Sequence, residues 1–251
     1  MSDQRSSVSR YLVQAGWDDV PHLSEQAKKE IIASTLPSLR DARTRGIPAM
    51  GAGAVYPIDE KDILVAPFRI PDWWPRVAGM DVGWRATAVV WMAHDRDNDV
   101  LYLITEYKRG TAEPAVHASA IKARGAWVPI MIDPSARGRS QIDGLSLLEM
   151  YSDLGLNVIP ADNAVEAGLF AVWERMTTQR FKVFSTCREW LAEFRLYRRD
   201  TKGKIVKEFD HLMDATRYAV HGGLQHARIK PIERSARAAV GAAIADVKAG
   251  Y

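Results

Sequence analysis

Hydrophobic residues dominate three runs in the middle of the chain, at 77–82, 86–93 and 100–107. Each run has the length and the side-chain pattern of a β-strand. The acidic stretch at 95–99 forms the turn between the second run and the third. Because strands joined by short turns lie side by side in opposite directions, the three runs predict an antiparallel set.

Helical and strand-like patterns alternate after residue 110. The predicted elements are a helix at 113–124, a strand at 127–132, a helix at 141–154, a strand at 157–160, a helix at 164–177, a strand at 181–184, a helix at 188–194, a polar hairpin at 196–209 that turns at 200–204, and a helix at 210–221. A strand that follows a helix can lie parallel to the first strand. Three antiparallel strands, then parallel strands and flanking helices, predict an α/β protein with the mixed sheet of the ribonuclease H-like fold.

The first quarter of the chain has a different character. Ser24 is placed to cap a short helix at 23–32, and a second helical piece includes 39–43. This region lacks the periodicity of a self-sufficient core, so we interpret it as an arm that packs on the domain or joins another one. The predicted parts are a partly helical connecting arm at 1–75, a ribonuclease H-like domain at 76–228 and a basic, helical C-terminal tail at 229–251.

Composition narrows the class of protein. The 251 residues are 47% hydrophobic and 26% charged, as in globular proteins, and the net charge of +3 allows an anionic partner without requiring one. The single cysteine, Cys187, excludes an intrachain disulfide and makes a thiolate metal cluster implausible. No apolar run approaches about 18 residues, so no membrane contact is expected.

Three acids occur where an unpaired charge would be costly. Asp81 lies in the first strand, Asp133 ends the apolar run at 128–132, and Asp214 lies in the last helix. A buried carboxylate is destabilising unless something pairs with it, and a metal ion is a common partner. We predict that the three acids converge to hold divalent metal ions.

Such a site suits the hydrolysis of phosphodiesters. Two Mg²⁺ or Mn²⁺ ions about 3.5–4 Å apart activate a water and stabilise the leaving oxygen. Hard cations select carboxylate oxygens. In this hypothesis Asp81 bridges the ions from the central strand, while Asp133 approaches from the end of the adjacent parallel strand and Asp214 from the helix.

Each acid also has a structural interpretation. Asp81 can start a turn, Asp133 can begin a turn with the proline and serine that follow it, and Asp214 can pair with Arg217. Two further acids are candidate ligands. Asp210, one helical turn before Asp214, is a helper ligand or, more in keeping with its place, an N-cap, and Glu106 is a candidate fourth acid near the end of its strand.

Other side chains are assigned by position alone. We predict that His211 is structural, and that Trp73, Trp74 and Trp84 pack rather than stack on bases. Basic residues in predicted loops can meet DNA phosphates, although each is better explained, taken singly, as a solvated surface charge. They are Lys108, Arg109, Arg137, Arg139, Lys202 and Lys204.

Several motifs together resemble one family. The chain resembles the C-terminal nuclease domain of the large terminase subunit of tailed bacteriophages. The residues that carry the resemblance lie at 45–48, 51–53, 79–84, 106–107, 132–135, 197–203 and 210–218. The last motif, Asp-His-Leu-Met-Asp-Ala-Thr-Arg-Tyr, is fairly specific, whereas Asp-x-Gly alone is weak.

The resemblance implies a metal-dependent endonuclease that cuts concatemeric double-stranded viral DNA in the cytoplasm of the infected bacterial host. It implies metal ligands at Asp81, Asp133 and Asp214, and a portal protein and a small terminase subunit as partners. The chain shows no Gly-x-x-x-x-Gly-Lys-Ser/Thr phosphate loop, so no ATPase motor is expected from these residues.

Other classes of protein fit parts of the pattern. An actin-like nucleotide-binding domain also begins with Asp-x-Gly on a hairpin, but it needs a second glycine-rich hairpin that Gly138 and Gly144 do not make. A non-catalytic module that docks to DNA or to the portal would keep the fold, yet an unused cluster of buried carboxylates would destabilise it. A Holliday-junction resolvase would share the acids and differ in its substrate.

Overall fold

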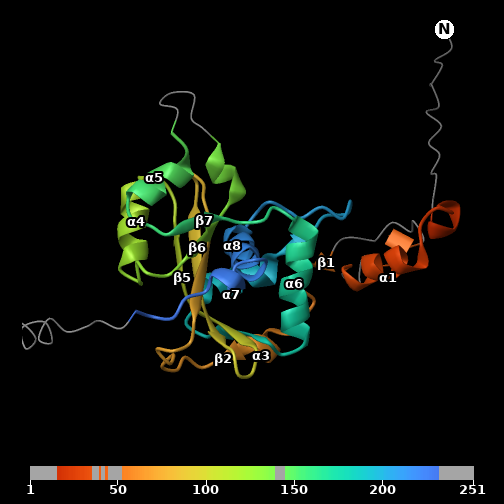
Figure 1. Ribbon diagram of the computed structural model, residues 1–251, viewed down its shortest axis with the longest axis horizontal. Coiled ribbons are helices and arrows are strands. Elements are labelled where there is room, and N and C mark those ends of the chain that lie inside the picture. The colour runs from red at the N-terminus through yellow and green to blue at the C-terminus, as the bar shows by residue number, and fades with distance from the viewer. Residues whose placement is uncertain (1–15, 36–39, 41–42, 45–52, 139–144, 232–251) are drawn as a thin grey trace, which may run out of the picture.

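A seven-stranded mixed sheet forms the centre of the protein (Figure 1). The computed structural model describes residues 16–35, 40, 43–44, 53–138 and 145–231. From edge to edge the strands are β2 (Leu64–Val65), β8 (Phe181–Phe184), β5 (Val100–Arg109), β4 (Thr87–Asp95), β3 (Arg76–Asp81), β6 (Ile130–Ile132) and β7 (Val158–Pro160). β3, β4 and β5 are antiparallel, and every other pairing in this sheet is parallel. The predicted ribonuclease H-like fold is confirmed.

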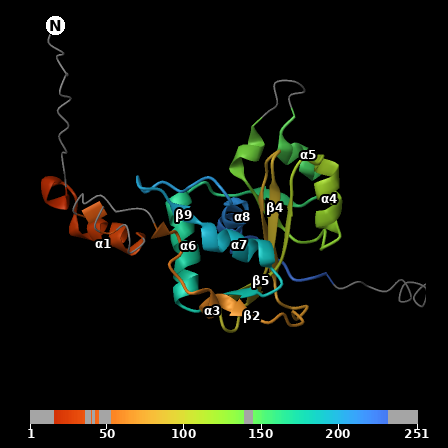
Figure 2. The same cartoon turned by 180° about the vertical axis from the view of Figure 1, so that it is seen from behind.

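Helices cover both faces of the sheet, as Figures 1 and 2 show from opposite sides. One face carries α4 (Pro114–Lys122) and α5 (Leu147–Asp153), and the other carries α6 (Val165–Thr177), α7 (Arg188–Leu196) and α8 (His211–Val220). Successive residues of a strand point to opposite faces. Accordingly Ala78 and Met80 belong to the core beneath α4 and α5, whereas Val77 belongs to the core beneath α6, α7 and α8.

A glycine brings α8 unusually close to β3. A Cβ built on Gly79 would lie only 1.8 Å from the carbonyl oxygen of Ala215 and 3.0 Å from Cβ of Ala219. Only a residue without a side chain fits between the strand and the helix backbone. Gly79 therefore sets the height of α8 above the strand that ends at Asp81.

Part of the predicted arm is built into the sheet. Residues 64–65 pair with β8 as its edge strand β2, next to α3 (Glu60–Ile63). The short strand β1 (Gly53–Ala54) pairs with β9 (Arg198–Arg199). Val55, Tyr56 and Ile63 are buried in the core. The sheet therefore begins before residue 76. The segment at 53–65 supplies backbone hydrogen bonds and apolar surface to the domain, although its sequence has no periodicity that predicts this.

The segment at 16–35 lies away from the sheet, beyond α6 (Figure 1). It contains a short 3₁₀ helix (Trp17–Asp19) and α1 (Glu25–Ala33), in which the hydroxyl of Ser24 accepts a hydrogen bond from the backbone N–H of Ala27, as predicted. The predicted helical piece at 39–43 and the tail beyond 231 fall largely outside the described residues. No described helix is both long enough and apolar enough to traverse a lipid bilayer.

Three local predictions were wrong. The helix predicted at 141–154 begins at Leu147, because Ser146 and Glu149 form a capping box that starts the helix there. Trp73 and Trp84 are 68% and 69% exposed, so they do not pack, whereas Trp74 stacks on Tyr102 as a packing residue should.

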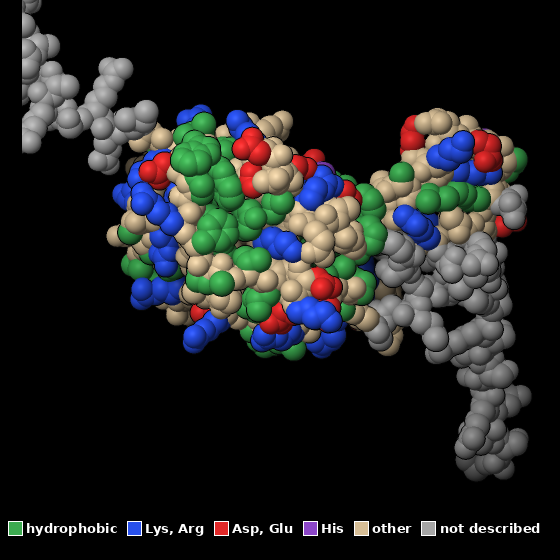
Figure 3. Space-filling model, turned by 90° about the horizontal axis from the view of Figure 1, so that it is seen from below, with side chains coloured by type: hydrophobic (Ala, Val, Ile, Leu, Met, Phe, Trp, Pro, Cys, Tyr) green, Lys and Arg blue, Asp and Glu red, His purple; other side chains and the backbone are tan. Residues whose placement is uncertain are grey.

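On the face of the molecule seen from below, exposed apolar side chains gather among lysines and arginines (Figure 3).

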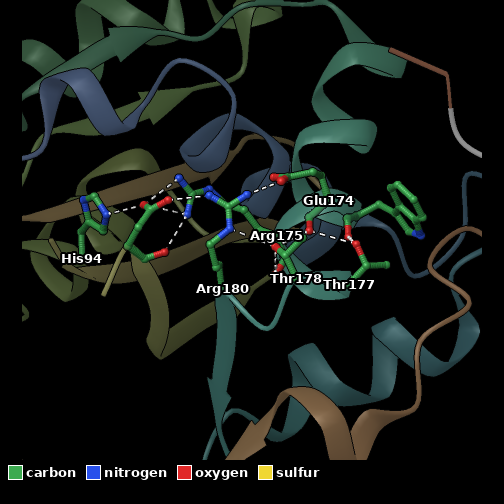
Figure 4. Close-up of polar contacts among 8 residues, drawn as sticks. His94, Glu174, Arg175, Thr177, Thr178 and Arg180 are labelled. Atoms are coloured by element: carbon green, nitrogen blue, oxygen red, sulfur yellow. Dashed lines mark hydrogen bonds and ion pairs between the residues drawn. The ribbon is translucent and has the colours of Figure 1, made fainter. Parts of the chain in front are cut away.

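An ion-pair network ties the far end of the sheet to α6 (Figure 4). Asp99, in the turn between β4 and β5, accepts hydrogen bonds from His94, Arg175 and Arg180 at 2.5–3.2 Å. Arg180 also pairs with Glu174. Partial desolvation opposes ionisation of Asp99, but these donors outweigh it and lower the pKa of its carboxyl group to about 2. This network fixes the sheet at the end opposite to Asp81.

Candidate active site

The three predicted acids meet at one cleft. Asp81 is the last residue of β3, and Asp133 directly follows β6, the parallel neighbour of β3. The backbone N–H of Asp133 donates to the carbonyl of Met80 at 2.9 Å, which fixes the two strand ends side by side. Asp214 comes from α8. The cleft has a volume of about 360 Å³, and its other polar lining residues include Lys207, Asp210, His211, Arg217 and Tyr218.

Asp81 is held by a histidine. Its side chain is 13% exposed, and Nδ1 of His211 lies 2.7 Å from Oδ2. Burial raises the pKa of Asp81, and the negative charges of Asp214 and Asp133 raise it further, while His211 opposes them. The hydrogen bond to Asp81 in turn raises the pKa of His211. The hydrogen bond between the two side chains in the cleft therefore depends on their protonation.

Asp214 is held by two cations. Nζ of Lys207 lies 2.9 Å from Oδ2, and the guanidinium of Arg217 lies 3.2–3.3 Å from Oδ1. Lys207 also reaches Oδ2 of Asp210 at 3.0 Å. Desolvation lowers the pKa of Lys207, but the two carboxylates outweigh it and raise the value overall. The alternative interpretation of Asp214, a pair with Arg217, is thus present within the same cleft.

Asp133 and Asp210 both combine the site with local structure. The carboxylate of Asp133 accepts from the backbone N–H and the hydroxyl of Ser135, at 2.9 and 2.7 Å, so it also begins the turn that the sequence predicts as an alternative. Asp210 occupies the N-cap position of α8, yet its side chain makes no capping bond and instead pairs with Lys207. Asp210 therefore lies among the residues of the cleft rather than serving as a side-chain cap.

Glu106 has a different role. Its carboxylate accepts from the backbone N–H groups of Glu189 and Trp190, at 2.9 and 2.7 Å, and so caps the first turn of α7. It lines a separate cleft of about 330 Å³. The structure thus places this candidate fourth acid apart from the other three, because the strand register directs it toward α7.

None of the predicted DNA-binding cations among the described residues lines this cleft. Lys108 pairs with the buried Glu193 at 2.6 Å. Four others are exposed, on the end of β5, on the turn after Asp133 and on the turn of the polar hairpin: Arg109, Arg137, Lys202 and Lys204. Arg139 lies outside the described residues.

Lys207, Arg217 and Tyr218 were missed as residues of the cleft, and His211 was assigned only a structural role. One signal was available, because positions 210, 211, 214, 217 and 218 recur on one side of a helix and would share a face. Lys207 precedes the helix and gave no comparable signal. Burial among the acids of the cleft raises the pKa of Tyr218, so its hydroxyl stays neutral.

The donor set suits divalent metal ions. Carboxylate oxygens from three separate elements line one space, and their mutual repulsion contributes to the raised pKa of Asp81. Within the described ranges, no three His, Cys, Asp or Glu side chains are gathered closely enough to hold an ion as they stand. In the structure the oxygens of these acids are instead in contact with Lys207, Arg217, His211 and Ser135. Three carboxylates from three separate elements nevertheless have the chemistry of a divalent metal site.

The family follows from comparison with known proteins. The family model of the terminase RNaseH-like domain matches residues 78–222, which is more than half of the chain. The chain belongs to this terminase family. It is 35% identical over 220 residues to the terminase large subunits of Salmonella phage P22 and Enterobacteria phage LP7. The alignments cover 84% of the chain but 44% and 46% of those proteins, so the chain spans a little under half of their length.

Solved structures agree with the family. The P22 large terminase nuclease domain is 33% identical, with a TM-score of 0.66, over 72% of the chain and 97% of that domain. The large terminase of a thermophilic bacteriophage shares the fold at 21% identity and a TM-score of 0.64, over 83% of the chain and 54% of that protein. The family model and the match to the P22 domain favour the terminase interpretation over the actin-like and resolvase alternatives.

Proposed function

We propose that this terminase domain is a metal-dependent endonuclease that hydrolyses phosphodiester bonds of double-stranded DNA during packaging of a viral genome. The observation that supports this most directly is the convergence of Asp81, Asp133 and Asp214 from three separate elements on one cleft. The similarity to the P22 large terminase nuclease domain, at 33% identity, also supports it.

Each acid has a role that follows from its position. Asp81, Asp133 and Asp214 would hold the metal ions. Asp210, which shares the ammonium group of Lys207 with Asp214, would be a helper ligand. Two bound Mg²⁺ or Mn²⁺ ions would supply an activated water and charge stabilisation of the leaving oxygen. His211 orients the carboxylate of Asp81 and holds a proton at its Nδ1 atom. Tyr218 is buried and lines the cleft beside the acids, with its hydroxyl neutral.

Contacts to DNA would rest on charge. Arg109, Arg137, Lys202 and Lys204 are exposed, and their charges suit phosphate oxygens. By extension from the family, the partners are double-stranded DNA, a portal protein and a small terminase subunit. The place of action is then the cytoplasm of the infected bacterial host.

The test is a plasmid-nicking assay with Mg²⁺, with Mn²⁺ and with EDTA, on wild type and two variants. Wild type should nick and linearise supercoiled plasmid with either metal and not with EDTA. Asp81→Asn should abolish cleavage while the fold is kept, because it removes one buried carboxylate that repels two others. Asp95→Asn is the matched control, since Asp95 is a buried acid at the opposite end of the neighbouring strand.

Three outcomes would count against the proposal. Cleavage that persists in EDTA would exclude metal dependence, and cleavage near the wild-type rate in Asp81→Asn would remove Asp81 from the site. A folded wild-type protein that binds DNA and cuts nothing with either metal would instead support the non-catalytic docking module.

A further inference from the structure

A lysine lies between two acids of the cleft. Nζ of Lys207 is 3.0 Å from Oδ2 of Asp210 and 2.9 Å from Oδ2 of Asp214. The two carboxylates are 7% and 9% exposed, whereas the Lys207 side chain is 67% exposed. The Lys207 side chain therefore lies at the solvent-exposed side of the cleft and is not part of the packed core.

The second cation on Asp214 is fixed in place. The Arg217 side chain is 3% exposed, and its guanidinium lies 4.5 Å from the centre of the Tyr218 ring. A Cβ built on Gly168 would come within 2.5 Å of Cγ of Arg217, so the side chain is pressed against α6. Arg217 holds Oδ1, which leaves Oδ2 as the oxygen of Asp214 that can change its partner.

A metal ion and Lys207 compete for that oxygen. A divalent ion binds a carboxylate oxygen at about 2.0–2.6 Å. Because Nζ lies 2.9 Å from the same oxygen, an ion there would be no more than about 5.5 Å from the ammonium group. Like charges so close in a partly buried site repel strongly. Of the two cations on Asp214, Lys207 is the one that has solvent to move into.

We propose that Lys207 is a displaceable internal cation: it neutralises Asp210 and Asp214 while the cleft lacks metal, gives way when a divalent ion binds, and then offers its charge to a DNA phosphate. The inference rests on the proposed function for the identity of the DNA ligand. Its consequence is linkage, since metal binding frees the lysine for DNA and DNA binding draws the lysine away from the metal site.

Calcium titration tests the first half without any cleavage. Ca²⁺ is a hard cation that carboxylates bind, and its affinity is measured by calorimetry on wild type, Lys207→Gln and Lys207→Arg. Lys207→Gln should bind Ca²⁺ about tenfold more tightly, within the usual range of coupling between sites. Lys207→Arg keeps the competing charge and should stay near wild type. Unchanged or weaker binding in Lys207→Gln would overturn the proposal.

Fluorescence anisotropy of a labelled duplex, with Ca²⁺ and with EDTA, tests the second half. In wild type Ca²⁺ should strengthen DNA binding, and in Lys207→Gln most of that gain should disappear. Lys204→Gln is the matched control, because Lys204 is exposed on the same hairpin and is not among the described residues that line the cleft. It should weaken DNA binding with and without Ca²⁺, and leave Ca²⁺ affinity unchanged.

The two arms separate failure of this inference from failure of the proposed function. Tighter Ca²⁺ binding in Lys207→Gln together with an inactive wild type would uphold the displaceable cation and reject the nuclease. An active nuclease in which Lys207→Gln keeps the full effect of Ca²⁺ on DNA binding would reject the transfer of the lysine to phosphate.

Discussion

Replacing Gly79 with alanine tests whether close packing of α8 on β3 builds the cleft. The added Cβ would lie 1.8 Å from the carbonyl oxygen of Ala215, whereas carbon and oxygen atoms in contact are about 3.3 Å apart. The helix must therefore shift by about 1.5 Å. Asp214 precedes Ala215, so the shift carries its carboxylate away from Asp81 and Asp133.

The magnitude follows from overpacking. Extra methyl groups in a well-packed core typically cost about 1–3 kcal/mol, and contact with a backbone carbonyl, which cannot rotate away, belongs at the upper end. For a domain of about 200 residues, each kcal/mol lowers the melting temperature by roughly 2–4 °C. We expect Gly79→Ala to melt about 6–12 °C lower. Its cleavage rate should fall about 100-fold, because a displacement of about 1 Å has that effect on aligned groups.

Urea denaturation, thermal melting and plasmid nicking measure these effects. Gly53→Ala is the matched control, since a Cβ there meets nothing within 4 Å. It should melt near wild type and cut DNA normally. A Gly79→Ala protein with wild-type melting and wild-type cleavage would refute the argument that this glycine sets the position of Asp214.

Other parts of the structure give three further predictions. Glu106→Gln should lower stability by about 1 kcal/mol in urea denaturation, as removal of a helix cap does, and leave Ca²⁺ affinity unchanged; weaker Ca²⁺ binding would make it a ligand after all. Asp99→Asn should lower the melting temperature at pH 7, and the difference from wild type should shrink as pH falls from about 4 toward 2. The pKa of Asp99 in the folded protein, about 2, lies below its ordinary value of 3.8, so the stability that Asp99 contributes is lost as it is protonated in that window. A difference in melting temperature that stays constant with pH would refute this. Changing Lys202 and Lys204 together to alanine should weaken binding to two unrelated duplexes alike and reduce the salt slope by about one unit for each phosphate that is no longer bound; a sequence-dependent effect would show direct reading of bases.

Much of the fold was predictable because hydrophobic periodicity and short turns determine neighbouring strands. The runs at 77–82, 86–93 and 100–107 became β3, β4 and β5 with the expected antiparallel order. The edge strand β2 was not predictable in the same way, because two residues cannot show a period. Its place comes from long-range pairing with β8 and from the burial of Ile63.

The acids of the site were predictable because a charge within an apolar run is conspicuous. Their partners were not, because pairing depends on where a distant side chain points once α8 is in place. Glu106 illustrates the limit: it also lies late in an apolar strand, yet the register turns it toward the start of α7. Trp73 and Trp84 were predicted to pack and are exposed. A large apolar side chain does not by itself indicate burial, so this error also has its origin in reading a residue type without its surroundings.

Because the acids of the cleft are paired, the stability of the metal-free protein does not distinguish a nuclease from a docking module. An unused cluster of buried carboxylates should destabilise a fold, and on the sequence alone this counts against a docking module. In the structure, however, Asp81 has His211, and Asp214 has both Lys207 and Arg217. A domain compensated in this way tolerates its acids without metal and without catalysis, so a stable apo protein is equally expected of a nuclease and of a docking module. Metal affinity and cleavage, rather than stability, therefore decide between the two functions.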